Sequence, residues 1–285
     1  MQPVALVCLI LALAVVAVAA RPQALPSPPV RHVHFVDATP DHRNFLFRGG
    51  DPNVGRHGAF DYDALTKSIQ LAAERVNVAL PPKFYLIDIN LTNLEADGDA
   101  HRTIAEWTFF NANPHLGKFI FWETHGTRDN ASDPLVPASL KQYMIENFKV
   151  WQGDQLVTRM EELRSMLYTN LTLPVVLYGH CDCGCDRTGE TMGAYYMKWL
   201  NYSWDQTNRL NTEFAERPMM CEEYLAMQYY CLYLNHSEGR KLNCLTNHPC
   251  TPRWKAALMR SMPSSGFNEA RVTTEAVVET VLPVD

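Results

Sequence analysis

A short stretch of the chain places a cysteine and an arginine at a spacing suited to anion chemistry. Cys181 and Arg187 lie six positions apart, with Gly184 between them. One tight loop can therefore hold a sulfur nucleophile and a fixed cation that face the same small anion. A thiolate is the attacking form of cysteine, and the arginine fork matches two phosphate oxygens. The residue types predict attack by Cys181 on a phosphate ester that Arg187 holds.

The residues around this loop predict the elements that position it. Residues 173–178 have the pattern of a buried strand, residues 179–188 form the loop, and a helix is expected from Gly189 towards Trp204. A strand, a glycine-bearing loop and a helix N-terminus together form a cradle for phosphate and would stabilise the thiolate. We expect Gly184 to permit a positive φ or a close approach of phosphate.

Strands and helices alternate along the rest of the chain. Further strands are predicted at 45–52 (entering a turn), 84–89 and 118–122, and further helices at 62–78, 103–110, 137–150, 155–168, 207–214 and 219–234. This alternation predicts an α/β fold with a central, mostly parallel sheet flanked by helices. In such sheets ligands bind at the carboxyl ends of strands, which places the site at the end of strand 173–178.

Residues 180–189 resemble the His-Cys-x5-Arg-Thr/Ser-Gly signature of the cysteine-based protein tyrosine phosphatase superfamily. Residues 48–52 are similar to the Arg-Ser-x-x-Pro segment of its dual-specificity and lipid phosphatase branches, and the resemblance spans about residues 40–215. It implies a protein tyrosine phosphatase-like fold and hydrolysis of phosphate monoesters through a phosphocysteine intermediate. The phosphate-binding loop would then comprise Cys181, Asp182, Cys183, Gly184, Cys185, Asp186 and Arg187.

The expected roles follow from chemistry and from this resemblance. Cys181 is the nucleophile and Arg187 the phosphate clamp, while the Thr188 hydroxyl donates to the departing sulfur in the hydrolysis step. His180 is expected to order the loop by hydrogen bonding rather than to transfer protons. No metal and no other cofactor is required for this reaction.

Two aspartates are candidates for the general acid that protonates the leaving oxygen. Most of the superfamily uses an Asp on a separate loop upstream of the cysteine, which Asp154 matches best, with Asp129 and Asp133 further back. An Asp directly before the arginine, here Asp186, resembles the acid of myotubularins and some bacterial tyrosine and lipid phosphatases. Asp154 could instead cap the helix that follows it. Both assignments stay open at this point.

The interior of the loop bears on the substrate. Phosphoinositide-directed members often carry lysine here, whereas this chain has Cys183 and Cys185. Asp182 and Asp186 add negative charge that disfavours polyanions. A phosphotyrosine-type protein substrate is therefore favoured, or a small phosphate ester; the alternative is a phosphoinositide or inositol phosphate.

Two other functions compete with the phosphatase prediction. His180, Cys181, Cys183 and Cys185 could hold a metal ion, but Cys-x-Cys-x-Cys spacing fits structural zinc poorly and Arg187 would repel a cation. The protein could also be a catalytically silent secreted binding protein in which Cys181 is oxidised. Arg48 is expected to make a surface salt bridge rather than line a pocket.

The apolar N-terminal segment and the sequons indicate the secretory pathway. Residues 1–20 form an apolar run with small residues at its end, typical of a signal peptide, so a secreted or lumenal protein is expected. The run lacks a positively charged start, so the alternative is an uncleaved membrane anchor. Beyond it we predict an extended Pro-rich segment at 21–40, a phosphatase-like domain with a Cys-containing helical C-terminal part at 41–261, and a loose tail at 262–285. No other segment could span a membrane, and no basic tract suggests nucleic acid. Five Asn-x-Ser/Thr sequons are candidate glycosylation sites: Asn90, Asn130, Asn170, Asn201 and Asn235.

Seven cysteines follow residue 20, so an oxidising compartment would leave at least one unpaired. Cys181 is the best candidate for the free thiol. Cys183 and Cys185 could stay reduced, pair with each other or join the C-terminal group, which comprises Cys221, Cys231, Cys244 and Cys250. The sequence alone does not choose among these pairings.

Overall fold

A computed structural model of the protein describes residues 30–55, 58–95, 98–131 and 136–244. The predicted signal peptide at 1–20, the tail at 262–285 and Cys250 lie outside the described residues. Among the helices that are described, none combines the length and the apolar character that a bilayer crossing requires.

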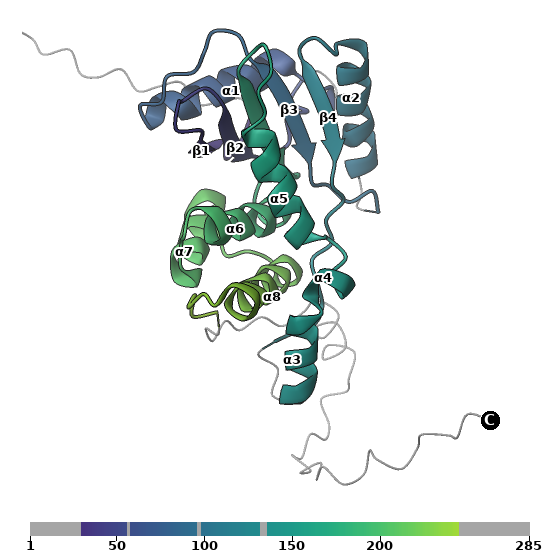
Figure 1. The fold of residues 1–285 in the computed structure, drawn as a ribbon. Coiled ribbons are helices and arrows are strands. Elements are labelled where there is room, and N and C mark those ends of the chain that lie inside the picture. Colours follow the sequence, from purple (N-terminus) through teal and green to yellow (C-terminus); the bar gives the residue numbers. More distant parts are fainter. Residues whose placement is uncertain (1–29, 56–57, 96–97, 132–135, 245–285) are drawn as a thin grey trace, which may run out of the picture.

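A five-stranded sheet forms the centre of the described fold (Figure 1). Its order is β1-β2-β5-β3-β4, in which β1 is antiparallel to β2 and the other neighbours run parallel. The strands are β1 (His34–Ala38), β2 (Phe45–Gly49), β3 (Tyr85–Asn90), β4 (Gly117–Phe121) and β5 (Val175–His180). This arrangement confirms the predicted α/β class with a mostly parallel sheet.

The edge strand β1 is the element that the sequence did not reveal. It lies within the segment 21–40, for which only an extended Pro-rich chain was predicted, and it pairs with β2. Its residues are mostly half-buried and include a His and an Asp, so no apolar run marks it. The sheet therefore uses part of the chain that precedes residue 41.

The central strand β5 is buried on both faces, which explains its uninterrupted apolar sequence. Val175 and Leu177 belong to one hydrophobic core, whereas Val176 and Tyr178 belong to another, as the two-residue period of a strand requires. The second core is covered by α1 (Tyr62–Arg75) and by Phe110 of α2 (Asp99–Ala112).

The remaining helices pack on the side of the first core. They are α3 (Ala138–Glu146), α4 (Phe148–Trp151), α5 (Leu156–Leu167), α6 (Arg187–Trp199), α7 (Trp204–Ala215) and α8 (Cys221–Glu238). Helices α5 and α6 lie next to the sheet, and α3 lies farthest from it, beside α8 (Figure 1). The helix predicted at 137–150 is split at Asn147. The predicted loop 179–188 is also shorter than expected, because β5 continues to His180 and α6 begins at Arg187.

Candidate active site

The loop between β5 and α6 comprises residues 181–186 and lies at the carboxyl end of the middle strand. Cys181 is its first residue, almost fully buried, and is the free cysteine of the described residues. Arg187 begins α6, so the N-terminus of that helix adjoins the loop. This is the strand, loop and helix arrangement that the sequence predicted around the nucleophile.

The loop rests on the segment around β2. Asp51 donates its backbone N–H to the Asp182 carbonyl at 2.9 Å, and His32 Nδ1 lies 2.7 Å from the Cys183 carbonyl oxygen. Gly184 has a φ of +76°, and a Cβ there would lie 2.4 Å from the carbonyl carbon of Gly49. The expected positive φ of Gly184 is confirmed, and its close neighbour is the protein backbone.

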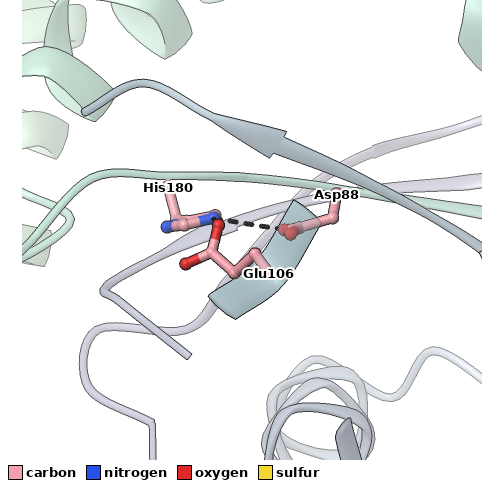
Figure 2. A group of neighbouring side chains, drawn as sticks. All are labelled: Asp88, Glu106 and His180. Atoms are coloured by element: carbon pink, nitrogen blue, oxygen red, sulfur yellow. Dashed lines mark ion pairs between the residues drawn. The ribbon is translucent and has the colours of Figure 1, made fainter. Parts of the chain in front are cut away.

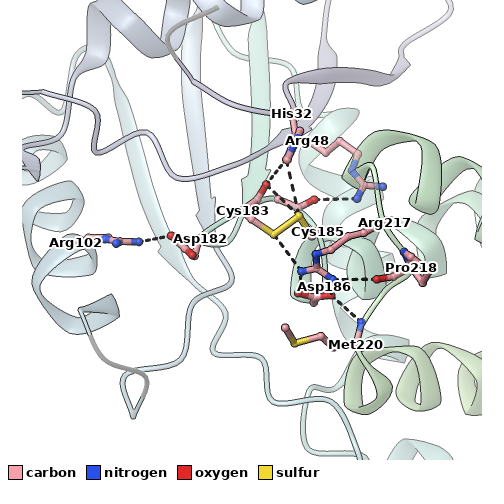
Figure 3. The surroundings of a disulfide bond; sticks show 11 residues. His32, Arg48, Arg102, Asp182, Cys183, Cys185, Asp186, Arg217, Pro218 and Met220 are labelled. Carbon is pink, nitrogen blue, oxygen red and sulfur yellow. Dashed lines mark hydrogen bonds and ion pairs between the residues drawn. A yellow bond between two sulfur atoms is a disulfide. The ribbon is translucent and has the colours of Figure 1, made fainter. Parts of the chain in front are cut away.

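Arg48 contributes to this support and corrects one expectation. The side chain is fully buried rather than on the surface. It donates to the Gly184 carbonyl at 3.1 Å, beside the loop disulfide (Figure 3). It also donates to Asn211 Oδ1 on α7. A buried guanidinium needs acceptors for its N–H groups, and these two serve Nη1 and Nη2 without a carboxylate, whereas Nε has no hydrogen-bond partner among the described residues. Arg48 therefore joins the loop to α7 instead of forming a surface salt bridge.

Two disulfides are present among the described residues. Cys183 is bonded to Cys185 within the loop (Figure 3), and Cys231 of α8 is bonded to Cys244. Cys221 is disulfide-bonded as well. The pairing within the loop leaves Cys181 as the free thiol, as predicted. The same disulfide uses the sulfur atoms of Cys183 and Cys185, which are two of the four ligands of the alternative metal site.

Arg187 is held beside Cys181. Its Nη1 lies 2.6 Å from Asp99 Oδ2 at the start of α2. Burial acts to lower the pKa of Arg187, but the Cys181 thiolate and Asp99 more than offset it, so the pKa is raised. The guanidinium is therefore a permanent cation close to the sulfur. The sequence did not predict this contact, because no local pattern links Asp99 to residue 187.

Thr188 follows Arg187 in the first turn of α6. Its side chain is fully buried, and its hydroxyl has no hydrogen-bond partner within the described part of the chain. A hydroxyl in this state keeps its donor free, which suits the predicted role in the hydrolysis step.

Asp186 is engaged by neighbouring donors (Figure 3). Arg217 donates to both of its oxygens, at 2.9 and 2.6 Å, and the Met220 backbone N–H donates at 2.8 Å. Such a bidentate pair suits a carboxylate that accepts hydrogen bonds rather than an acid that gives a proton away.

The Asp154 carboxylate also accepts hydrogen bonds, but from the loop that follows β4. It is fully buried and accepts the backbone N–H groups of His125 and Gly126, each at 2.8 Å. The N-cap of α5 is Gln155, so the alternative role of Asp154 as a helix cap is wrong. Asp154 instead anchors the loop that follows β4.

A pocket of about 370 Å³ opens at the loop. It is lined by Asn93, Thr124, His125, Cys181, Asp182, Cys183, Asp186, Arg187, Arg217, Met220 and Glu223. Cys181, Arg187 and Asp186 are thus brought together, whereas Asp154 and Thr188 are not among the lining residues. Arg217 and Glu223 reach the pocket by the packing of α8, and no local sequence signal identified them.

His180 belongs to a buried charge cluster behind the loop (Figure 2). Its Nε2 lies 3.2 Å from Asp88 Oδ1 and 3.4 Å from Glu106 Oε2, and all three side chains are fully buried. Burial opposes protonation of His180, but Glu106 and Asp88 raise its pKa well above the usual value. Burial raises the pKa of Glu106 to about 7. An imidazolium therefore pairs with both carboxylates behind the loop, but neither ring nitrogen makes a hydrogen bond within the described residues, so the ordering of the loop by His180 stays a prediction.

The same three residues form the group that could hold a metal ion in the described ranges, since their ligand atoms lie within 4.8 Å of one another. A protonated His180 already neutralises charge at this place and leaves no free lone pair on Nε2. A metal ion at this cluster would have to displace that proton.

The predicted glycosylation sites differ in exposure. Asn90 is fully buried at the end of β3, and its side chain donates to Glu106, so a glycan there is incompatible with this fold. Asn170 and Asn201 are exposed, while Asn130 and Asn235 are partly buried.

Comparisons with known proteins found similarity only at the level of solved structures. No protein-family model matches the chain, and no curated protein matches it. The solved structures that resemble it include the core catalytic domain of the PP-IP phosphatase SIW14 from S. cerevisiae, with 15% identity and a TM-score of 0.37 over 74% of this chain and 90% of that one. The Yvh1 phosphatase domain from Chaetomium thermophilum has 13% identity and a TM-score of 0.33 over 73% and 96%. The Cydia pomonella PTP-2 phosphatase has 14% identity and a TM-score of 0.26 over 62% and 80%.

Proposed function

We propose that the protein is a cysteine-dependent phosphatase that hydrolyses phosphate monoesters through a phosphocysteine intermediate. The observation that carries this proposal is the shared pocket of Cys181 and Arg187 at the N-terminus of α6. A free thiol and a fixed guanidinium face one cavity there, and the helix dipole favours an anion at the same place.

The reaction follows from these contacts. The Cys181 thiolate attacks phosphorus, the ester oxygen leaves, and Arg187 binds the oxygens of the transferred group. Water then cleaves the phosphocysteine, and the Thr188 hydroxyl donates to the departing sulfur. The assignment of the acid to Asp154 or Asp186 stays a prediction, and the contacts of both carboxylates argue against it.

A phosphotyrosine-type protein substrate remains the favoured ester. Asp186 offsets the charge of Arg217, Asp99 that of Arg187 and Asp182 that of Arg102, so the pocket has little uncompensated positive charge for a polyanion. The second candidate is a phosphoinositide or inositol phosphate. Arg217 in the pocket wall supports it, because a second phosphate could displace Asp186 from that guanidinium.

We also propose that the protein is secreted or lumenal. The apolar run at 1–20, the exposed sequons at Asn170 and Asn201 and the disulfides Cys183–Cys185 and Cys231–Cys244 support an oxidising compartment. Secretion from a eukaryotic host and a loss of mass after endoglycosidase treatment are the expected results; retention of unmodified protein in the cytosol would contradict this.

The substitution Cys181→Ser tests the reaction. Release of phosphate from an aryl phosphate and from a phosphotyrosine peptide should fall to background, while the variant still binds the peptide. A double Cys231→Ser, Cys244→Ser variant is the matched control, because it makes the same replacement far from the loop and should keep turnover. Full activity of Cys181→Ser would refute the mechanism, and a folded wild type without turnover, with or without reductant, would favour the silent binding protein.

A further inference from the structure

The start of α8 brings a third carboxyl group to the pocket. Glu223 lies in the first turn of that helix and lines the same cavity as Cys181 and Arg187. It comes from beyond the stretch 40–215 that resembles the phosphatases. The packing of α8 therefore places a proton-carrying group beside the nucleophile.

The three carboxyl groups of the pocket differ in their partners. Asp182 pairs with Arg102 and Asp186 pairs with Arg217. Glu223 Oε2 is buried and has no hydrogen-bond partner within the ranges the structure describes. Glu223 is thus the lining carboxyl whose hydrogen-bonding capacity is not already taken by a cation.

The position of Glu223 is fixed by the loop after β4. Gly126 approaches so closely that a Cβ there would lie 2.4 Å from the Glu222 carbonyl carbon, and Thr127 donates its backbone N–H to that carbonyl at 2.9 Å. Asp154 in turn holds the backbone of Gly126. Asp154 therefore acts as a positioning residue for the start of α8, which gives this predicted acid an indirect task.

The surroundings of Glu223 set its protonation. Burial raises the pKa of Glu223 to about 7, and the carboxylates of Asp186 and Glu222 add to the rise, while Arg187 opposes it. Glu190 and Arg217 also interact electrostatically with Glu223. Below pH 7 the carboxyl group keeps its proton, and above it the proton is lost. An acid with this pKa suits proton transfer near neutral pH.

We propose that Glu223 is the general acid of the reaction and, in its second half, the general base. The proposal rests on the phosphatase function proposed above. As Cys181 forms its bond to phosphorus, the bond from phosphorus to the ester oxygen breaks, and that oxygen takes the Glu223 proton. The Glu223 carboxylate then takes a proton from the attacking water. The sulfur–phosphorus bond breaks with its electron pair on Cys181, so phosphate is released and Glu223 is protonated again.

The variant Glu223→Gln tests this assignment, with Glu222→Gln as the matched control on the same helical turn. Aryl phosphates with a graded series of phenol leaving groups are followed by release of the phenol across pH 5 to 9. For phenyl phosphate and a phosphotyrosine peptide, Glu223→Gln should lower kcat/KM about 10²-fold. For a strongly acidic phenol, which needs no proton, the loss should be less than about tenfold. The alkaline limb near pH 7 should disappear in Glu223→Gln. Glu222→Gln should keep kcat/KM and retain the limb, moved slightly to lower pH because the Glu222 charge contributes to the raised pKa of Glu223.

The possible outcomes separate the two proposals. If the wild type turns over, Cys181→Ser does not, and Glu223→Gln loses the same factor for every phenol or nothing at all, Glu223 is not the acid while the phosphatase function stands. If Cys181→Ser remains active, or the folded wild type releases no phenol, both proposals fail. Glu223→Asp retains the carboxyl group and should keep the alkaline limb, which distinguishes lost chemistry from a disturbed fold.

Discussion

The two ends of the loop between β5 and α6 carry charge in different ways. At the strand end, His180 and its two carboxylates are sealed inside the sheet and contact one another. At the helix end, Asp186 and Arg187 also have ionic partners, yet they line an open pocket. Charge at the strand end can therefore serve only the fold, whereas charge at the helix end is available to a ligand.

The largest effect on stability is expected at the strand end. His180→Gln would leave Asp88 and Glu106 buried without a cation, and the free energy of unfolding should fall by about 3–5 kcal/mol. Urea denaturation measures this loss. His125→Gln is the control, because that side chain is half-exposed and should change stability by less than about 0.5 kcal/mol. Adding Glu106→Gln to His180→Gln should recover part of the loss. If all of these variants were equally stable, the charges at the strand end would not be needed for the fold.

At the helix end, Arg187→Lys should leave stability nearly unchanged and reduce turnover. A lysine offers a point charge in place of the planar fork, so kcat/KM should fall by about 10²-fold. Steady-state hydrolysis of an aryl phosphate gives the value, and Arg209→Lys on the exposed side of α7 serves as the control. Turnover like that of the wild type would show that Arg187 does not clamp the phosphate.

A smaller change is expected from Thr188→Val, which removes the unpartnered hydroxyl but keeps the shape of the side chain. Hydrolysis of the phosphocysteine should slow by about tenfold, the worth of one hydrogen bond, while its formation does not. Rapid-quench kinetics would then show a burst of phenol. Thr191→Val is a matched control, since that hydroxyl is equally buried and unpartnered one turn along α6. A burst in the control alone would contradict the assignment.

The smallest effect should come from the rim of the pocket. Arg102 pairs with Asp51 at 3.0 Å and with Asp182, and its side chain is 35% exposed. Solvent screens such pairs, so Arg102→Met should cost less than about 1 kcal/mol in the free energy of unfolding. A loss as large as that of His180→Gln would mean that the ion pairs at the rim stabilise the fold as much as the buried charges at the strand end.

The chemistry of the loop could be predicted because it is local. The spacing of Cys181 and Arg187, the flanking strand and helix, and the need for glycine at 184 all lie within one short stretch. The sheet class followed from the alternation of strands and helices, and buried strands such as β5 carry a plain apolar run.

The partners of these residues could not be predicted, because packing brings them together from distant parts of the chain. Arg48 has the charge of a surface residue, and only its acceptors on the loop and on α7 explain its burial. Asp99 reaches Arg187 from α2, and Arg217 reaches Asp186 from the turn before α8. β1 carries no apolar run because much of its surface is half-buried at the edge of the sheet.

The origin of the pocket wall has a consequence for how such a protein can change. Arg217 and Met220 lie past the stretch that resembles the phosphatases, yet they shape the cavity in front of Cys181. In the proposed reaction, replacements at these two positions would alter which ester fits while the side chains of Cys181 and Arg187 stay in place. A gene lineage can therefore diversify its substrates through a short exchangeable segment, and a laboratory library confined to that segment would sample the same variation while the reaction stays constant.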